Sequence, residues 1–321
     1  MSQDSTPKIE LLEADAAEVL IVMDNYVDLL LPNGPRVERP VLAKNGRIPS
    51  TTLLAEHGLS LLISMERQGR THQVLLDAGY TQVGVPHNLD MLGVSLTGLE
   101  AVVLSHGHMD HFGSLPEVVR RVGRPVTLVV HPDALQGQRY RKTPFGDLVA
   151  FPKLSAEQLT AAGAQIVLSQ EPYLASSKMW AATGQVPRIT DFEHGMPGVV
   201  KDYGQGLVPD PLADDMAIVL NLKDKGLAVI SGCAHSGIIN TVRHAVQMTG
   251  VDRVHAVMGG FHLGGPSMEP IIDATVRELK AYGPQIVMPI HCTGRNAQAE
   301  IERAMGSAYV VSSVGSRVIL A

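Results

Sequence analysis

Features that several other classes of protein need are scarce in this sequence of 321 residues. Aromatic residues make up only 4% of the chain, and the formal net charge at pH 7 is −6. Few aromatic rings leave no platform on which bases would stack, and a negative chain opposes a broad surface for phosphate backbones. The composition therefore predicts no general nucleic-acid interface, although it allows a local cationic pocket for one small anion.

Long apolar runs are also absent. Runs such as Val19–Met23 and Leu59–Ser64 fall far short of the roughly 20 residues that a transmembrane helix needs, so no membrane-spanning segment is expected. Met1–Glu10 lacks the basic and apolar regions of a secretory signal. We therefore expect a cytoplasmic protein in which the only two cysteines, Cys233 and Cys292, are reduced.

Short β-branched runs alternate with segments of helical periodicity, and 45% of the residues are hydrophobic. Several runs are apolar throughout, which is typical of strands buried on both faces. The pattern predicts an α/β fold in which helices cover both sides of the sheet, within one domain over residues 1–321. The predicted strands are Val19–Met23, Leu59–Met65, Gln73–Asp77, Ala101–Ser105, Val126–His131, Ala217–Leu222, Leu227–Ser231, His255–Met258, Ile286–Ile290 and Val310–Leu320; the predicted helices are Leu115–Val122, Ala156–Ala162, Ile238–Met248, Pro270–Ala281 and Asn296–Met305.

The range of about 132–214 has many Gly and Pro residues and little sustained periodicity. We interpret it as a lid-like insertion of loops and short elements that covers a site. Two interpretations are open for four of its cations: contacts to a substrate phosphate, or ordinary solvated charges. These cations are Arg139, Arg141, Lys142 and Arg188.

The densest group of the 13 histidines follows the predicted strand Ala101–Ser105. Residues two apart on an extended backbone point to the same side, so His106 and His108 would bind one metal ion. Asp110 and His111 come at the entry to the next helix and would face a second ion. Without metal, three imidazoles and a carboxylate side by side would lack partners.

Three more histidines follow predicted strands, and each lies near glycine. They are His235 after Gly232-Cys233-Ala234, His262 after Gly259-Gly260-Phe261, and His291 before Cys292-Thr293-Gly294. Loops beyond the carboxyl ends of strands are where α/β proteins gather catalytic groups. We therefore expect these histidines to converge on the same site.

The run His106-x-His108-x-Asp110-His111 after a strand, with later histidines at strand ends, resembles the metallo-β-lactamase superfamily. Further motifs resemble one branch, the 7,8-dihydropterin-6-methyl-4-(β-D-ribofuranosyl)-aminobenzene-5′-phosphate synthase-like proteins, from about Asp24 to the C-terminus. The resemblance implies a four-layer αβ/βα sandwich with a dinuclear metal site at one edge. The branch motifs are Asp191-Phe192-Glu193, Asp214-Asp215-x-Ala217, Gly232–Val242, Gly259–Leu263 and His291–Gly294.

The resemblance also implies the ligands, position by position. Many relatives bridge the two ions with an aspartate, but here the matching strand end reads Gly232-Cys233, so a bridging hydroxide alone would join the ions. For the third ligand of the first metal we expect His235, with Cys233 and His194 as alternatives. The implied sets are His106, His108 and His235 for the first metal, and Asp110, His111 and His291 for the second.

Four other residues would support this site. Asp77 matches an aspartate near the site in relatives, where it would accept an N–H from a ligating imidazole; a cap of the turn before Gly79 is the alternative. Asp24 and Asn25 end a strand and would line the site. His262 stands where some nuclease relatives have a histidine, so we expect a phosphate contact or general acid.

Two close cations lower the pKa of a bridging water, and the resulting hydroxide attacks the substrate without a strong protein base. Nitrogen-rich ligands with one carboxylate favour zinc, but manganese and iron accept them too. The sequence thus predicts a hydrolase, with Asp110 in its catalytic centre, that cleaves a phosphodiester or a small phosphorylated metabolite.

Other functions stay open at this stage. They include hydrolysis of a lactone or carboxylic ester, the synthase activity of the branch name, and a non-catalytic binding module. An oxygen-reducing di-iron protein fits less well, because such relatives usually have Glu where His108 stands and need a flavin domain. Whether the chain forms a homo-oligomer is also open.

Overall fold

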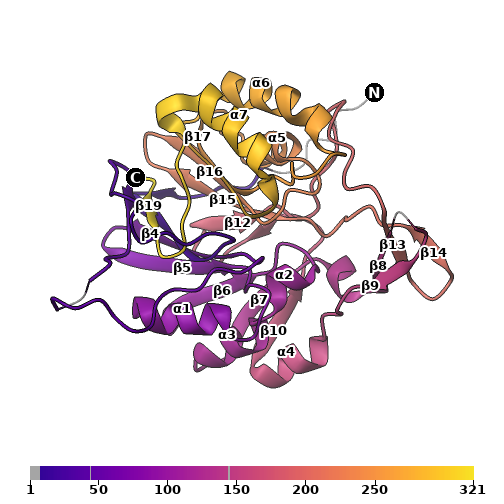
Figure 1. Ribbon diagram of the computed structural model, residues 1–321, viewed down its shortest axis with the longest axis horizontal. Helices are drawn as coiled ribbons and strands as arrows, with labels where there is room; N and C mark the ends of the chain where they lie inside the picture. Colours follow the sequence, from indigo (N-terminus) through magenta and orange to yellow (C-terminus); the bar gives the residue numbers. More distant parts are fainter. Residues whose placement is uncertain (1–7, 44, 144) are drawn as a thin grey trace.

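The computed structural model describes residues 8–43, 45–143 and 145–321. Two large sheets face each other, and helices cover the outer face of each, giving four layers (Figure 1). The predicted α/β sandwich is therefore confirmed. No helix among the described residues has the length and apolar character needed to cross a membrane.

The first large sheet has eight strands in the order β10-β7-β6-β5-β4-β2-β19-β3. Strands β5, β6, β7 and β10 are mutually parallel, so their carboxyl ends share one edge. The strand bounds are β2 Ala16–Met23, β3 Val37–Glu38, β4 Ser60–Arg67, β5 Arg70–Leu76, β6 Leu99–Val103, β7 Val126–Val130, β10 Ala164–Leu168 and β19 Arg317–Ile319.

The second large sheet has the order β11-β12-β15-β16-β17-β18, and β1 also pairs with β15. Strands β16, β17 and β18 are parallel, so their carboxyl ends also lie together. The strand bounds are β1 Glu13–Ala14, β11 Tyr173–Leu174, β12 Trp180–Ala182, β15 Ala217–Leu222, β16 Gly226–Ser231, β17 Val254–Gly260 and β18 Ile286–Ile290.

Alternating side chains explain why the central strands are apolar throughout. In β2, Val19 and Ile21 join the core between the two sheets, whereas Leu20 and Val22 join the core under the helices of the first sheet. Both faces are thus removed from water, which is the dominant favourable term in folding. The second sheet divides its side chains in the same way.

Helices α1, α3 and α4 pack on the first sheet, and α5, α6 and α7 on the second. Helices α5 and α6 end at Gly250 and Gly283 in the left-handed conformation that glycine adopts without strain. The helix bounds are α1 Gly84–Leu92, α2 Met109–Phe112, α3 Leu115–Arg121, α4 Ala156–Ala162, α5 Ile238–Thr249, α6 Ile272–Tyr282 and α7 Arg295–Met305, with 3-10 turns η1 Pro132–Leu135, η2 Glu269–Ile271, η3 His291–Thr293 and η4 Gly306–Ala308.

The range predicted as an insertion, about 132–214, is divided among all three sheets. Strand β10 extends the first large sheet and β12 the second, so this part of the interpretation is wrong. Only a small antiparallel sheet stands apart, at the right of Figure 1. Its strands are β8 Gln138–Lys142, β9 Leu148–Ala150, β13 Val199–Asp202 and β14 Leu207–Pro209.

Two other expectations differ from the structure. The strand predicted over Val310–Leu320 is limited to β19, Arg317–Ile319, because the chain before it forms a turn. Helix α1 was not predicted, since it contains Pro86. Proline is tolerated there because the first turn of a helix has no intrahelical acceptor for its N–H groups.

Candidate metal centre

The six side chains predicted as metal ligands meet where the strand ends of the two large sheets face each other. His106 and His108 lie in the loop after β6, and Asp110 and His111 lie in α2, in the middle of the view in Figure 1. His235 follows β16, and His291 follows β18. All six are buried, so residues from both sheets form one cluster.

The first ligand set is His106, His108 and His235, whose ligand atoms all lie within 4.8 Å of one another. The Nε2 atoms of His106 and His235 are 3.1 Å apart. Two imidazoles on one tetrahedral zinc would have their nitrogens about 3.3 Å apart, given the usual Zn–N distance. The three side chains therefore have a spacing that suits one ion.

The second set is Asp110, His111 and His291, again within 4.8 Å of one another. The Asp110 Oδ2 atom lies 3.3 Å from His291 Nε2 and 3.7 Å from His111 Nε2. The carboxylate thus faces two imidazoles at distances that a shared ion would span. Each set draws ligands from both large sheets.

Unpartnered nitrogens give an independent test of whether metal fits here. His108 Nε2 and His291 Nε2, one from each set, are buried without a hydrogen-bond partner. A buried nitrogen without a partner costs free energy, and the neutral imidazole of histidine is the commonest metal ligand in proteins. The donor set therefore fits two divalent ions.

The electrostatics of the first set favour neutral imidazoles. Burial, followed by the charge of Arg139, lowers the pKa of His108 to about 3. Burial and the neighbouring histidines also lower the pKa of His106 and His235 well below the ordinary value. Neutral imidazole is the form that binds a metal.

Asp77 orients His111 in the second set. Its Oδ2 atom lies 2.6 Å from His111 Nδ1 and accepts a 2.8 Å hydrogen bond from Ser105 Oγ, while Oδ1 accepts one from Ser105 N. The Nδ1–H of His111 thus donates to the carboxylate, leaving Nε2 to face the cluster. Burial alone lowers the pKa of His111, but Asp77 and Asp110 raise it to about 9.

Asp24 and Asn25 hold His291. Asp24 Oδ1 accepts a hydrogen bond from the backbone N–H of His291, and Asn25 Oδ1 lies 3.2 Å from its Nδ1. His57 also reaches this side: it stacks on His291 and places Nε2 3.5 Å from Asp110 Oδ2. His57 was not among the residues predicted from the sequence to support the site.

Cys233 lies within the cluster, with Sγ 3.2 Å from His111 Nε2. Burial and the hydrogen bond with Cys292 raise the pKa of the Cys233 thiol. His194, the other alternative for the first metal, is exposed and belongs to none of the candidate metal groups among the described residues. The structure therefore brings His235 and Cys233 into the cluster but not His194.

His262 lies beside the first set, with its ring 4.2 Å from that of His235. Its Nδ1 atom has no hydrogen-bond partner. Burial lowers the pKa of His262, but the hydrogen bond and charge of Cys292 raise it. His262 therefore lies next to the first set with one ring nitrogen unpartnered.

Four of the nine non-glycine residues with positive φ in the described chain lie at this centre: Asp77, Ala234, His262 and His291. Their φ values, from 44° to 63°, are costly for residues with a Cβ atom. The conformation persists because buried hydrogen bonds and packing fix each strand end. Strained backbone conformations are therefore concentrated at the predicted site.

Arg139 corrects one expectation from the sequence. It is buried and donates 2.6 Å hydrogen bonds to Asp210 and Asp214, so it is paired inside the protein and does not face a substrate. Asp214 also accepts a hydrogen bond from Gly107 N, and Asp215 accepts one from Ser236 N. The Asp214-Asp215 motif thus holds the loops that carry His108 and His235.

The other three cations considered for a substrate phosphate lie in different surroundings. Lys142 is exposed at the end of β8. Arg141 is half-buried, and its Nη1 atom lacks a partner. Arg188 donates to the carbonyl oxygens of Pro211 and His235, at 2.6 and 3.4 Å. Only Arg188 contacts a predicted metal ligand.

A pocket of about 520 Å³ lies beside Arg188. Its walls are largely apolar, and include Phe192, Met196, Met268 and Ile271. A second hollow of about 510 Å³ lies beside His291 and includes Arg295. His291 itself lines the second hollow, and the first is linked to the predicted ligands through the contact of Arg188 with the carbonyl oxygen of His235.

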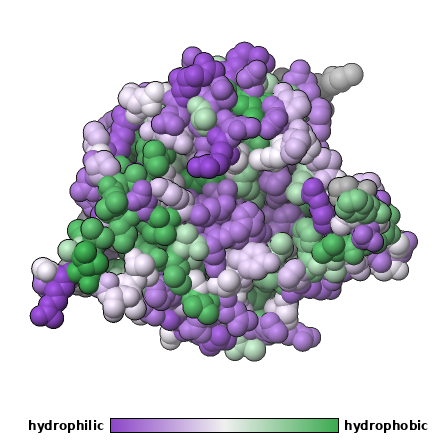
Figure 2. All heavy atoms as spheres, viewed as in Figure 1, coloured by the Kyte–Doolittle hydropathy of each residue, from purple (hydrophilic) through white to green (hydrophobic). Residues whose placement is uncertain are grey.

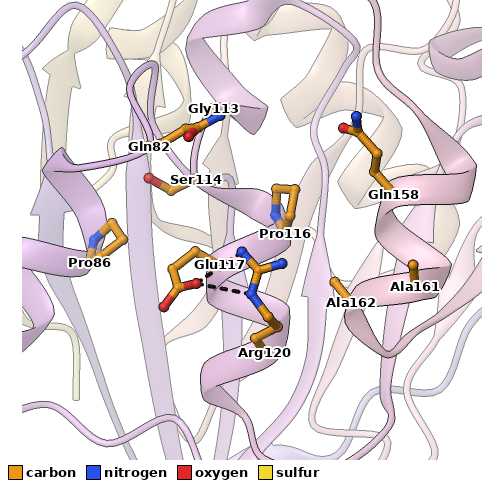
Figure 3. Close-up of a pocket in the computed structure, with 10 residues that line it drawn as sticks. All are labelled: Gln82, Pro86, Gly113, Ser114, Pro116, Glu117, Arg120, Gln158, Ala161 and Ala162. Carbon is orange, nitrogen blue, oxygen red and sulfur yellow. Dashed lines mark hydrogen bonds and ion pairs between the residues drawn. The ribbon is translucent and has the colours of Figure 1, made fainter.

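Figure 2 shows hydrophilic residues in the middle of this face, between the helices of the two large sheets, with hydrophobic residues on either side. On the right they lie over the small sheet, where Leu148, Val149, Leu207 and Val208 are exposed. A further pocket of about 550 Å³ lies among α1, α3 and α4 (Figure 3). An ion pair of Glu117 and Arg120 lies on its wall, and none of the six predicted ligands lines it.

Comparisons with known proteins agree with this architecture. Residues 57–205 match the sequence model of the Metallo-beta-lactamase superfamily. A Methanocaldococcus jannaschii protein named 7,8-dihydropterin-6-methyl-4-(beta-D-ribofuranosyl)-aminobenzene-5'-phosphate synthase is 27% identical over 76% of this chain and 83% of its own length. An uncharacterized protein from the same organism is 30% identical over 79% of this chain and 91% of its own length.

A solved structure supports the fold. The crystal structure of Tm1679, described as a metal-dependent hydrolase of the beta-lactamase superfamily, has a TM-score of 0.71 at 21% identity. The structural match covers 94% of this chain and 98% of the Tm1679 chain. At this identity the likeness concerns the fold.

Proposed function

We propose that this chain, which belongs to the metallo-β-lactamase superfamily, is a dinuclear metal-dependent hydrolase of a phosphodiester or small phosphorylated metabolite. The observation that carries the proposal is the pair of three-residue ligand sets, each with a buried Nε2 atom that lacks a partner. A purely structural role would leave these buried groups unpaired.

His106, His108 and His235 would hold one ion, and Asp110, His111 and His291 the other. When bound, divalent ions, with zinc as the first expectation and manganese or iron as alternatives, supply Lewis-acid polarisation of the substrate and activation of water. The chain's own residues keep the ligands fixed: Asp77 orients His111, and Asn25 orients His291. His262 would contact the substrate phosphate or donate a proton to the leaving group.

Arg188 supports an anionic substrate. It is half-buried, its Nε atom has no hydrogen-bond partner, and it lines the pocket of about 520 Å³. Its contact with the carbonyl oxygen of His235 joins this pocket to the first ligand set. The apolar walls would take the rest of a small organic molecule, while the guanidinium binds its phosphate.

The experiment begins with metal content, measured by elemental mass spectrometry on protein purified without chelator or a metal-binding tag. We expect about two ions per chain and turnover of a chromogenic phosphodiester or of a panel of phosphorylated metabolites. Asp110→Ala should lose one ion and most turnover while keeping its fold by circular dichroism, whereas His87→Gln, outside the cluster, should keep both. Absence of bound metal after reconstitution with zinc, manganese and iron would refute the proposal.

Arg188 has a matched control in Lys142, a cation that is exposed on β8. Loss of a charged hydrogen bond costs about 1.5–3 kcal/mol, so Arg188→Ala should raise KM for a phosphorylated substrate roughly tenfold or more. Lys142→Ala should leave KM unchanged. Equal effects of the two substitutions would remove Arg188 from the substrate site.

A synthase is the second candidate, because a relative that matches 76% of this chain is named for making an aminobenzene 5'-phosphate compound. Such an enzyme would also need a pocket for a phosphorylated ring compound. Incubation of metal-loaded protein with paired pterin and ribosyl-phosphate substrates would detect a condensation product. A panel of lactones and carboxylic esters tests the remaining alternative, because hydrolysis of these alone would exclude the phosphoester.

A further inference from the structure

We propose that Cys233 is a ligand shared by both metal ions, placed between the two three-residue sets. The inference rests on the proposed function, because it assumes that these sets hold two ions. Cys233 comes two residues after β16 and is 3% exposed. It therefore approaches the cluster from the same strand end as His235.

The Cys233 sulfur lies close to both three-residue sets. Cys233 Sγ lies within 4.8 Å of ligand atoms from four of the six predicted ligands. Two of these, His106 and His235, belong to the first set, and two, His111 and His291, belong to the second. A group with neighbours in both sets is placed to bind both ions.

The measured separation also suits coordination. Cys233 Sγ lies 3.2 Å from His111 Nε2. A thiolate and an imidazole on one tetrahedral zinc lie about 3.6 Å apart, from the usual Zn–S and Zn–N distances. Only a small adjustment would bring both atoms onto one ion.

Packing alone does not account for this cysteine. A buried cysteine is often a small hydrophobic group, but Cys233 belongs to none of the three hydrophobic clusters in the described chain, whereas its neighbour Ala234 does. Its sulfur lies within 4.8 Å of imidazole nitrogens from both predicted ligand sets. The side chain thus lies on the polar side of the loop.

The backbone around Cys233 is fixed on both sides. A Cβ atom added at Gly232 would lie 2.1 Å from Ser105 Oγ, and one added at Gly260 would lie 2.4 Å from the carbonyl oxygen of Gly232. Ala234 has a φ of 53°. No side chain would fit at either glycine, and the 3.1 Å hydrogen bond from Gly260 N to the carbonyl oxygen of Gly232 fixes the strand end next to Cys233.

A shared thiolate would also narrow the choice of metal. Soft sulfur ligands favour zinc over magnesium, calcium or manganese, which prefer oxygen. The centre should therefore retain zinc or cobalt in preference to manganese.

Cobalt gives a direct test, because thiolate-bound Co²⁺ has an intense charge-transfer band in the near ultraviolet. Metal-free full-length protein is titrated with Co²⁺ alone, and bound cobalt is counted by elemental mass spectrometry. We expect the band in the wild type and in Cys292→Ser, the matched control, and its loss in Cys233→Ser and Cys233→Ala. We also expect the Cys233 variants to bind cobalt at least about tenfold more weakly, since even outer residues of metal sites contribute that much.

Two results would overturn the assignment while leaving the two-ion proposal intact: two bound cobalt ions without the band, or a band that disappears only in Cys292→Ser. Failure of the wild type to bind cobalt would overturn both proposals.

X-ray absorption of the zinc-loaded wild type and Cys292→Ser needs no Cys233 variant and so does not depend on how such variants fold. A sulfur neighbour at about 2.3 Å in both proteins supports the assignment, and its absence from either contradicts it.

Discussion

The contact between Asp77 and His111 determines which nitrogen of His111 faces the cluster of predicted metal ligands. Both side chains are fully buried, and the carboxylate also accepts two hydrogen bonds from Ser105. Such a carboxylate fixes the tautomer and the ring orientation of a ligating histidine. The contact thus links the end of β5 to the second ligand set.

Asp77→Asn keeps the size of the side chain but removes its charge and offers an amide to His111. We expect metal affinity of the second set to fall about 10–100-fold, the usual effect of such a partner. Competition with a metal indicator would measure the change, and circular dichroism would check the fold. Unchanged affinity would mean that Asp77 only caps its turn.

The same contact predicts a pH dependence for the metal-free protein. Burial alone lowers the pKa of His111, but Asp77 and Asp110 raise it to about 9, above the value of about 6.5 in an unfolded chain. The stabilisation is fully present below pH 6.5 and disappears as the pH rises through 9, a loss of about 3 kcal/mol. Urea unfolding in chelator at several pH values would measure it, and a wild-type slope matching that of Asp77→Asn would contradict it.

Single residues were predictable where a local pattern places them. The alternation of His106 and His108 and the strand-end positions of His235 and His291 are visible in the sequence, and the structure brings all four together. His57 was not predictable, because it stacks on His291, which lies 234 positions later in the chain (291 − 57 = 234). The sequence left Arg139 as either a substrate contact or a solvated charge, because its pairing with Asp210 and Asp214 also joins residues distant in sequence.

The loop between β6 and α2 is held by an element distant in sequence. Asp214, just before β15, accepts hydrogen bonds from Gly107 N and from Arg139. Burial raises the pKa of Asp214, but Arg139 lowers it below the ordinary value. The ionised carboxylate therefore connects the small sheet, the second large sheet and the histidine loop.

Asp214→Asn should loosen this loop. One charged hydrogen bond is weakened inside the protein, so we expect a loss of roughly 1–3 kcal/mol in the free energy of unfolding and weaker metal binding by the first set. Asp90→Asn breaks an exposed ion pair with Arg121 and should cost less than about 1 kcal/mol. Urea unfolding and metal titration would compare them; equal losses would show that Asp214 has no special role in the loop.

Among elements, most central strands were predictable, whereas the edge strands β10 and β11 were not; the edge strand β18 was predicted because all of its residues are buried and apolar. Strand β16 is buried throughout, and β4 and β6 are buried over most of their length, so each contains a run of apolar residues that marks it as a strand. Strand β10, at the edge of the first sheet, mixes buried and exposed residues, so its pattern resembles a loop. Strands β9 and β14 are three residues long and exposed throughout, which leaves too few positions for a period to be recognised.

For the whole molecule, the ligand sets join the two large sheets. His106, His108, Asp110 and His111 follow the first sheet, whereas His235 and His291 follow the second. The hydrophobic core between the sheets holds them together from inside. Bound ions would add a connection at the edge, where buried imidazoles without partners are otherwise unfavourable.

Removal of metal should therefore destabilise the entire fold and not only the site. A ligand that binds only the folded state contributes about 2.7 kcal/mol per ion when its free concentration is about 100 times Kd. Urea unfolding of the zinc-loaded protein, with and without chelator, would measure the difference. Asp110→Ala should retain about half of this difference in the free energy of unfolding, because the first set remains intact. His87→Gln should retain all of the difference. The same free energy of unfolding with and without zinc would show that bound ions do not connect the sheets, even if the protein is active.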